Sequence, residues 1–314
     1  MMRGTMTVPS STLRPASTLW LLLVSLRPKQ WTKNLLLFLP FLFTINVRWD
    51  PAHLRPALET FGQVAFGFVL FCLLSSALYI LNDIVDREND QRHLVKRLRP
   101  IPSGALSLGL AGTASGILGV TALAVSLVLI PLFGIVALVY AALSMGYSLC
   151  LKQIVIVDVL AIAAGFVLRA VAGAIVIDVP ISPWLYICAT LGALFLACGK
   201  RRNELLALGQ GSAAHREALK DYSPALLDQM IAVITPSLLI SYSLYTFSAP
   251  NLPKNNAMML TIPFVVYGIF RYLYLMHIRN LGGSPEDILL SDRPLLVAIL
   301  LWAATAGGIL LAFR

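Results

Sequence analysis

The residues with the clearest chemical potential are four side chains that follow the second long apolar block of the sequence. Asn82, Asp86 and Asp90 recur at intervals of four residues, and Asp83 lies beside them. On a helix this spacing gathers the side chains on one face, where like charges repel one another. Carboxylate and amide oxygens are the ligands that Mg²⁺ prefers, and Mg²⁺ commonly completes its shell with phosphate oxygens. The pattern therefore predicts a magnesium site at Asn82, Asp83, Asp86 and Asp90, with the three aspartates as catalytic residues.

A solvated helix end is the alternative for this acidic run, because Arg87 and Arg92 are close enough in sequence to pair with the acids. The segment that follows, 96–104, holds three cations and then a Pro/Gly turn. Alone, such a segment is typical of a positive-inside anchor of a membrane protein. Directly after an acidic motif, its Lys96 and Arg99 are instead predicted to bind phosphate oxygens around the metal.

The elements that must position these side chains are long apolar blocks. The chain has 314 residues, of which 58% are hydrophobic and 12% charged, and its mean hydropathy is +0.80. Blocks of about 20 apolar residues are long enough to cross a bilayer as helices, which satisfy their own backbone polar groups. We therefore expect an all-α polytopic membrane helix bundle with nine transmembrane helices. The expected spans are 34–47, 61–81, 105–128, 132–149, 157–178, 183–199, 226–248, 257–278 and 294–313.

The chain is expected to divide at its first span. Residues 1–33 would form a cytoplasmic N-terminal segment, in which the apolar stretch 18–26 is a candidate interfacial helix, and residues 34–314 a single transmembrane catalytic domain. Most of the 24 lysines and arginines fall in short segments on one side of the nine spans, which places the N-terminus and the acidic run inside. Topology and phosphate ligands thus account for the net charge of +9, and nucleic acid is not an expected partner.

In expected helix number, orientation and motif position, the chain resembles the UbiA superfamily of intramembrane prenyltransferases over nearly its whole length. That family has nine transmembrane helices and an Asn-x-x-x-Asp-x-x-x-Asp motif after the second, which Asn82, Asp86 and Asp90 match. An Arg-Pro turn, Arg99-Pro100, follows the motif.

The sequence departs from the family pattern after the sixth expected span. The family carries a second acidic motif, Asp-x-x-x-Asp, at that place, where this sequence has Lys200, Arg201, Arg202, Asn203 and Glu204. Two acidic motifs usually hold two Mg²⁺ ions on a polyprenyl diphosphate, so the replacement argues against that donor. Cations suit a ligand with an additional phosphate group, bound directly rather than through metal. We therefore predict substrate contacts at Lys200, Arg201, Arg202 and Glu204.

Shorter segments narrow the resemblance to one branch of the family. Residues 27–34 read RPKQWTKN, residues 147–152 read YSLCLK, and residues 292–295 read DRPL. In this order they are similar to the decaprenyl-phosphate phosphoribosyltransferases of mycobacteria and their relatives. The resemblance implies further substrate contacts at Lys29, Lys33, Asn34, Tyr147 and Lys152.

The same resemblance implies a reaction. The donor would be phosphoribosyl pyrophosphate (PRPP), the acceptor a long-chain polyprenyl phosphate such as decaprenyl phosphate, and the cofactor Mg²⁺. The product would be 5-phosphoribosyl-1-phosphoryl-polyprenol, which feeds arabinose donors to cell-wall polysaccharide, and pyrophosphate would be released. It further implies a multi-pass protein of the bacterial plasma membrane with its active site on the cytoplasmic face. The sequence leaves self-association into a homo-oligomer open.

Two other functions stay open on sequence grounds. A prenyltransferase that moves a polyprenyl chain onto an aromatic ring, as in quinone or haem pathways, would share the fold, but the replaced second motif argues against it. A transporter is the other alternative, although discontinuous helices and repeats are not apparent. Three predicted contacts also have plainer alternatives, with Lys29 and Lys33 as topology anchors and Tyr147 as an interfacial belt residue.

Two arginines, Arg169 and Arg271, lie inside expected spans. Charge within a membrane span is costly and usually functional or paired. For Arg169 the sequence offers Asp158 or Asp178 as the partner and does not decide between them.

Overall fold

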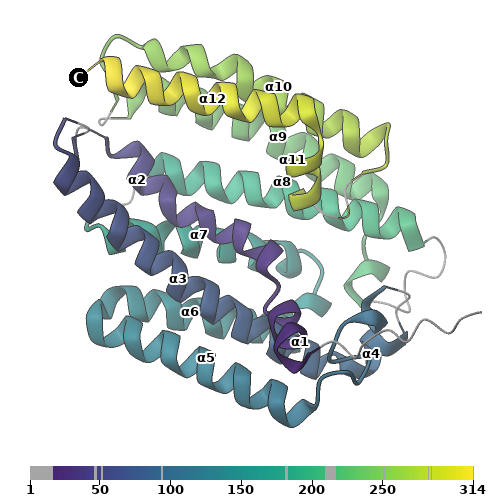
Figure 1. The fold of residues 1–314 in the computed structure, drawn as a ribbon. Helices are drawn as coiled ribbons and strands as arrows, with labels where there is room; N and C mark the ends of the chain where they lie inside the picture. The colour runs from purple at the N-terminus through teal and green to yellow at the C-terminus, as the bar shows by residue number, and fades with distance from the viewer. Residues whose placement is uncertain are drawn as a thin grey trace, which may run out of the picture.

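Long apolar α-helices lying side by side make up most of the chain (Figure 1). The computed structural model describes residues 17–45, 48–50, 52–92, 95–180, 183–208, 217–249, 252–281, 283 and 285–313. These residues form no β-strand, which confirms the all-α class. In chain order, the long helices are α3 (Leu54–Val85), α5 (Leu108–Leu129), α6 (Pro131–Leu149), α7 (Val157–Val176), α8 (Pro183–Leu208), α9 (Pro224–Ser248), α10 (Ile262–His277) and α12 (Arg293–Ala312).

The shorter elements connect these helices. Figure 1 shows α5 and α6 at one side of the bundle, α10 and α12 at the other, and α1 and α4 at the end opposite the C-terminus. The short helices are α1 (Thr18–Ser25), α2 (Leu39–Phe43), α4 (Arg87–Arg92) and α11 (Pro285–Ser291). The 3₁₀ helices are η1 (Pro28–Phe38), η2 (Lys96–Leu98), η3 (Leu151–Gln153), η5 (Glu217–Lys220) and η6 (Ala257–Thr261).

Seven helical segments in the described part of the chain are long and apolar enough to cross a membrane. They are α3, α5, α6, α7, α9, the joined η6 and α10, and α12. The expected count of nine is therefore not confirmed. The first expected span, 34–47, is divided between the end of η1 and the five-residue α2. The sixth, 183–199, lies in α8, which continues into the polar residues 200–204 and is not among the seven.

The part of the N-terminal segment that the structure describes begins at residue 17 and contains one short helix. The apolar stretch 18–26 forms α1, whose Leu19 and Trp20 are exposed. Its other face packs on a small cluster that includes Ile80 and Ile101. An exposed apolar face beside a basic end fits a helix at the membrane surface, and the division of the chain at residue 33 stays a prediction. Residues 1–16 lie outside the described residues.

Two large apolar clusters lie inside the bundle, one in each half. One half packs η1, α3, α6 and α7 around residues such as Phe71 and Phe133. The other packs α7, α8, α9 and α10 around residues such as Leu227 and Met276. The helices also expose large apolar side chains, with Val128 at the end of α5 79% exposed. Apolar surface of this kind suits contact with lipid tails, where a soluble protein would present polar groups.

The contact between η1 and α7 is unusually close. A Cβ on Gly173 of α7 would lie 2.1 Å from the backbone oxygen of Leu37 in η1. Only glycine, which has no Cβ, allows two backbones to approach to this distance. Gly173 therefore lets η1 lie directly against α7, and Leu37 is fully buried there.

We expect Gly173→Ala to destabilise the fold by about 1–3 kcal/mol or more, because the added methyl group meets backbone that cannot rotate away. Thermal unfolding of the detergent-purified variant measures the effect. Gly112→Ala on α5 is the matched control, since a Cβ there meets nothing within 4 Å. Equal unfolding temperatures for the two variants would contradict the close packing of η1 on α7.

Candidate active site

The predicted metal residues lie where α3 ends and α4 begins. Asp86 caps α3, and its backbone N–H donates to the Asn82 carbonyl at 2.9 Å. The Asp90 N–H donates in turn to the Asp86 carbonyl at 2.8 Å. The backbone thus keeps its i, i+4 spacing across the junction, so that Asn82, Asp86 and Asp90 follow one another on one side of the chain.

Cations neutralise the two buried carboxylates of this run. Asp83 and Asp90 are 2% and 3% exposed. One nitrogen of the Arg99 guanidinium donates to both, at 3.0 Å to Asp83 and 3.1 Å to Asp90. Arg27 also donates to Asp83, and the Lys96 ammonium lies 3.3 Å from an Asp90 oxygen. The structure therefore places Lys96 and Arg99, which follow the run in sequence, directly against it.

Arg27 is a contact of the acidic run that sequence reasoning did not place in the site. It lies between α1 and η1 with φ of 53°, a left-handed conformation that residues with a side chain rarely adopt. Its guanidinium also lies 5.2 Å from the centre of the Tyr79 ring. Burial lowers the pKa of Arg27 from its ordinary value, and the Asp83 carboxylate opposes that shift. Pro28 signals only the break between α1 and η1, because a proline disfavours the helical conformation at the residue before it, and no local signal predicts the contact with Asp83.

Asp86 and Asn82 are the oxygen donors of the run that fit a metal ion. The Asp86 side chain is 21% exposed and accepts a 2.6 Å hydrogen bond from Lys152 in η3. The Asn82 side chain makes no hydrogen bond within the described residues. Among those residues, no group of three or more Asp, Glu, His or Cys side chains is arranged to hold a metal. An amide and a carboxylate therefore suit an Mg²⁺ ion that takes the rest of its shell from phosphate oxygens and water.

A second cluster of predicted residues surrounds Arg201 near the end of α8. Its guanidinium is 1% exposed and donates to Asp158 at 2.5 Å, to Glu204 at 2.7 Å and to the Tyr147 hydroxyl at 2.8 Å. Asp158 also accepts a 2.7 Å hydrogen bond from the Tyr222 hydroxyl. Burial raises the pKa of Tyr222, which keeps it a donor. Arg201 therefore joins α6, α7 and α8, a structural role that the sequence did not indicate.

The two cations that flank Arg201 are more accessible. Lys200 and Arg202 are both partly exposed. Arg202 donates to Asp228 of α9 at 2.6 Å, and a His277 ring nitrogen lies 3.2 Å from the same carboxylate. Of the cations in the predicted segment, Lys200 and Arg202 are therefore the two that are partly exposed.

The end of α6 connects the two clusters. Tyr147 in its last turn contacts Arg201, and Lys152 in the η3 turn that follows contacts Asp86. Segment 147–152 thus lies between the acidic run and the cationic end of α8.

The predicted contacts on η1 face different surroundings. Lys29 is exposed. Lys33 is partly buried at the wall of an apolar cavity and donates to Gln30 at 2.5 Å. Asn34 is fully buried against α3 and α7, where it contacts protein groups.

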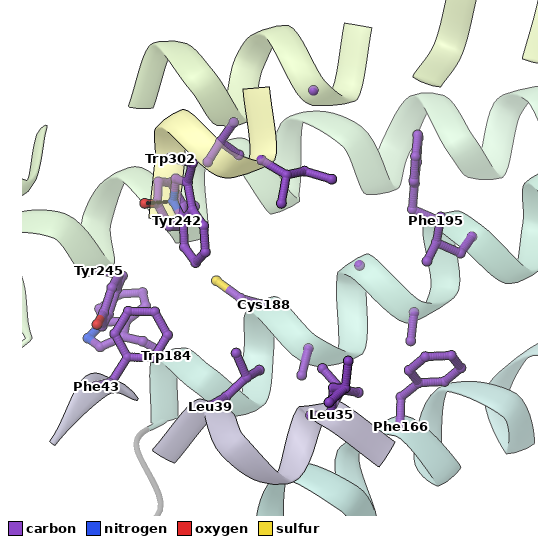
Figure 2. A pocket seen from close by; sticks show the side chains of 18 of the residues that line it. Leu35, Leu39, Phe43, Phe166, Trp184, Cys188, Phe195, Tyr242, Tyr245 and Trp302 are labelled. Carbon is purple, nitrogen blue, oxygen red and sulfur yellow. Dashed lines mark hydrogen bonds between the residues drawn. The ribbon is translucent and has the colours of Figure 1, made fainter. Parts of the chain in front are cut away.

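The apolar cavity has a volume of about 860 Å³ and separates η1 and α2 from the second half of the bundle. Thr32 and Lys33 are among its few polar lining residues. Figure 2 shows Phe166 and Phe195 toward one end of the cavity. Aromatic side chains gather at the other end, where Figure 2 labels Phe43, Trp184, Tyr242, Tyr245 and Trp302. The volume is typical of a ligand site, and the apolar wall suits a hydrocarbon chain.

Charged clusters at one end of an all-helical membrane bundle, with an apolar cavity between η1 and the second half of the bundle, define a multi-pass membrane protein whose site combines charged and apolar surfaces. The chain belongs to the UbiA prenyltransferase family, whose pattern it matches over residues 38–286. That range includes the acidic run, the cationic end of α8 and most of the cavity wall.

Curated relatives narrow the likeness further. The chain is 33% identical over 296 residues to a protein of Mycobacterium tuberculosis named decaprenyl-phosphate phosphoribosyltransferase. The aligned residues cover 94% of this chain and 95% of the relative. A Corynebacterium glutamicum protein of the same name is 33% identical over 287 residues, covering 88% and 83%. Among solved structures, a UbiA homologue from Archaeoglobus fulgidus bound to GPP and Mg²⁺ shares the fold. Its TM-score is 0.69 at 18% identity, over 92% of this chain and 99% of the homologue.

Proposed function

We propose that this chain transfers the 5-phosphoribosyl group from PRPP to a polyprenyl phosphate and releases pyrophosphate. The observation that carries the proposal is the cationic end of α8, which replaces a second acidic motif beside the single acidic run. The names of the relatives that match nearly the full chain support the same reaction. The site would face the cytoplasm of a bacterial plasma membrane, because the basic loops lie on its side of the bundle.

The apolar cavity would receive the first isoprene units of the acceptor. Its wall offers apolar and aromatic contacts between η1, α2 and the second half of the bundle. Lys33 is the cation at this wall, so it would bind the acceptor phosphate where the lipid chain enters. The rest of a long polyprenyl chain would leave between helices into the bilayer.

The cations around the acidic run would bind the phosphates of PRPP. Lys96, Arg99 and Lys152 are each partly exposed and already hold carboxylates of the run. Phosphate oxygens are strong acceptors for such donors. Lys200 and Arg202, on the far side of Tyr147, would bind the 5-phosphate, which a prenyl diphosphate does not have.

Asn82 and Asp86 would hold Mg²⁺, which neutralises charge on the leaving pyrophosphate when bound. The chain's own cations would fix the donor so that ribose C1 faces the acceptor phosphate. The bond from C1 to the pyrophosphate oxygen breaks, and a bond from C1 to an acceptor phosphate oxygen forms, through an oxocarbenium-like state as in glycoside chemistry. The nucleophile is already anionic near pH 7, so positioning and charge carry the catalysis.

The test is turnover by the purified protein in detergent with Mg²⁺ and two labelled donors. With PRPP and a polyprenyl phosphate, we expect a labelled phosphoribosyl lipid and free pyrophosphate in equal amounts. With a polyprenyl diphosphate and an aromatic acceptor such as 4-hydroxybenzoate, we expect no prenylated product. Prenylation without phosphoribosyl transfer would overturn the proposal in favour of the aromatic prenyltransferase that family membership also supports.

A further inference from the structure

Arg169 is a buried cation in the middle of a membrane-spanning helix. It lies in α7 and is 5% exposed. Its guanidinium donates to the Asn34 side-chain oxygen at 2.8 Å, to the Gly165 carbonyl at 2.8 Å and to the Tyr140 hydroxyl at 2.7 Å. It also lies 4.7 Å from the centre of the Tyr140 ring and 5.5 Å from that of Phe166. Neutral acceptors and two aromatic faces thus solvate the charge.

No carboxylate pairs with Arg169 in the described part of the chain. The expectation of Asp158 or Asp178 as its partner is therefore wrong, since Asp158 is bound by Arg201 and Tyr222. A buried charge without a counter-ion costs stability, and an apolar residue of similar size would avoid that cost. The charge contacts two other segments, through Tyr140 of α6 and Asn34 of η1. Of these two segments, η1 lines the apolar cavity, so the contact with Asn34 is the one that calls for a functional explanation.

Asn34 lies on η1 and connects it to two helices. It is fully buried, accepts from Arg169 of α7, and donates to the Ser75 hydroxyl of α3 at 3.2 Å. Its amide nitrogen also lies 3.3 Å from the Cys72 sulfur. Asn34 and Leu37 are the two buried residues of η1, and Leu37 lies on Gly173 of the same α7.

The conformation of η1 needs such support. It is a 3₁₀ helix of 11 residues, whereas 3₁₀ helices longer than three or four residues are uncommon because their hydrogen bonds are poorly aligned. With three residues per turn, consecutive side chains point about 120° apart. Holding Asn34 inward therefore fixes the direction of its neighbour Lys33, which lies at the cavity wall.

We propose that Arg169 is a positioning residue that locks η1 through Asn34 and so aims Lys33 at the acceptor phosphate at the cavity wall. The proposal rests on the proposed function for the identity of that phosphate. It assigns Asn34, predicted from the sequence as a substrate contact, to the support of η1. The lock itself is a property of the protein without substrate, so it is testable separately.

The structural test is hydrogen–deuterium exchange of the full-length protein in detergent, without substrate. Arg169→Met and Asn34→Leu should each speed exchange of the η1 amides by roughly ten- to a hundredfold, the effect of losing a charge-assisted hydrogen bond. Exchange in α5 should be unchanged. Tyr140→Phe is the matched control, because it removes another hydrogen bond of Arg169 and leaves the one to Asn34. If an Arg169→Met preparation does not fold, Arg169→Lys replaces it, since one ammonium nitrogen does not reproduce the three hydrogen bonds that the guanidinium makes from three separate nitrogens.

The kinetic test separates positioning from general destabilisation. Arg169→Met should raise KM for the polyprenyl phosphate by roughly tenfold and leave KM for PRPP within about twofold. Combined with Lys33→Ala, it should add little, because a misdirected Lys33 has already lost its contact. Unchanged η1 exchange in Arg169→Met and Arg169→Lys would overturn the lock. Faster η1 exchange with an unchanged acceptor KM would overturn the positioning role. Absence of any phosphoribosyl transfer by the wild-type protein would instead overturn the proposed function.

Discussion

Asp86→Asn is expected to lower kcat by roughly a hundred- to ten-thousandfold while the protein stays folded. A bound metal ion supplies several kcal/mol of charge stabilisation to a reaction of this kind, and each 1.36 kcal/mol is tenfold in rate. Asp86 is the accessible carboxylate of the acidic run, and its hydrogen-bond partner is Lys152 at the surface of the site. The Asp86→Asn change removes a charged metal ligand and keeps an amide oxygen that can still accept the hydrogen bond from Lys152.

Turnover and thermal unfolding, measured on the same preparation, check this expectation. Asp83→Asn is the comparison, because it makes the same chemical change at a buried residue held by Arg27 and Arg99. That variant should lose stability as well as activity, since the partly exposed Arg27 and Arg99 lose the buried carboxylate that they share. Chelation of Mg²⁺ by EDTA should reproduce the Asp86→Asn loss and be reversed by added Mg²⁺. Full activity of Asp86→Asn, or in EDTA, would remove the metal from the mechanism.

Local features of the sequence predicted much of the fold. The long apolar blocks became helices because their composition and length suit a membrane span, and the block at 157–178 corresponds closely to α7. The first block was the exception. Residues 28–38 form a long 3₁₀ helix, whose buried Asn34 and Leu37 are held by contacts with α3 and α7. Periodicity along one segment carries no information about such distant support, so the division of the expected first span was not foreseeable.

In the candidate site too, the sequence predicted local relations between residues but not their tertiary partners. Spacing predicted that Asn82, Asp86 and Asp90 would follow one another, because that relation depends on the local backbone alone. The partner of each charge depends on tertiary structure. Asp158 and Arg201 are 43 residues apart and meet at 2.5 Å. The sequence predicted Arg201 as a phosphate contact from its charge and its place in the cationic segment. Its burial and its contacts indicate instead that it holds three helices together.

The burial of Arg201 predicts a large effect of its substitution on the stability of the protein. Arg201→Met is expected to lower the free energy of unfolding by about 3–5 kcal/mol, because breaking a buried ion pair leaves the other charge uncompensated. The uncompensated group is Asp158, which is fully buried and would keep only the Tyr222 hydroxyl as a donor. Thermal and denaturant unfolding in detergent measure the loss. Arg202→Met is the matched control, since its partner Asp228 is partly exposed and stays solvated when the pair is lost, so the expected loss is about 0–1 kcal/mol.

A second substitution distinguishes the two roles of Arg201. If Arg201 mainly holds Asp158, then Arg201→Met combined with Asp158→Leu should recover most of the lost stability, because both buried charges are gone. If Arg201 mainly binds phosphate, the single variant should unfold like wild type and raise KM for PRPP by roughly ten- to a hundredfold. Under the buried-pair account, that KM effect belongs to Lys200 and Arg202, which are accessible. A stable Arg201→Met with a raised KM would therefore reverse the assignment and return Arg201 to the substrate.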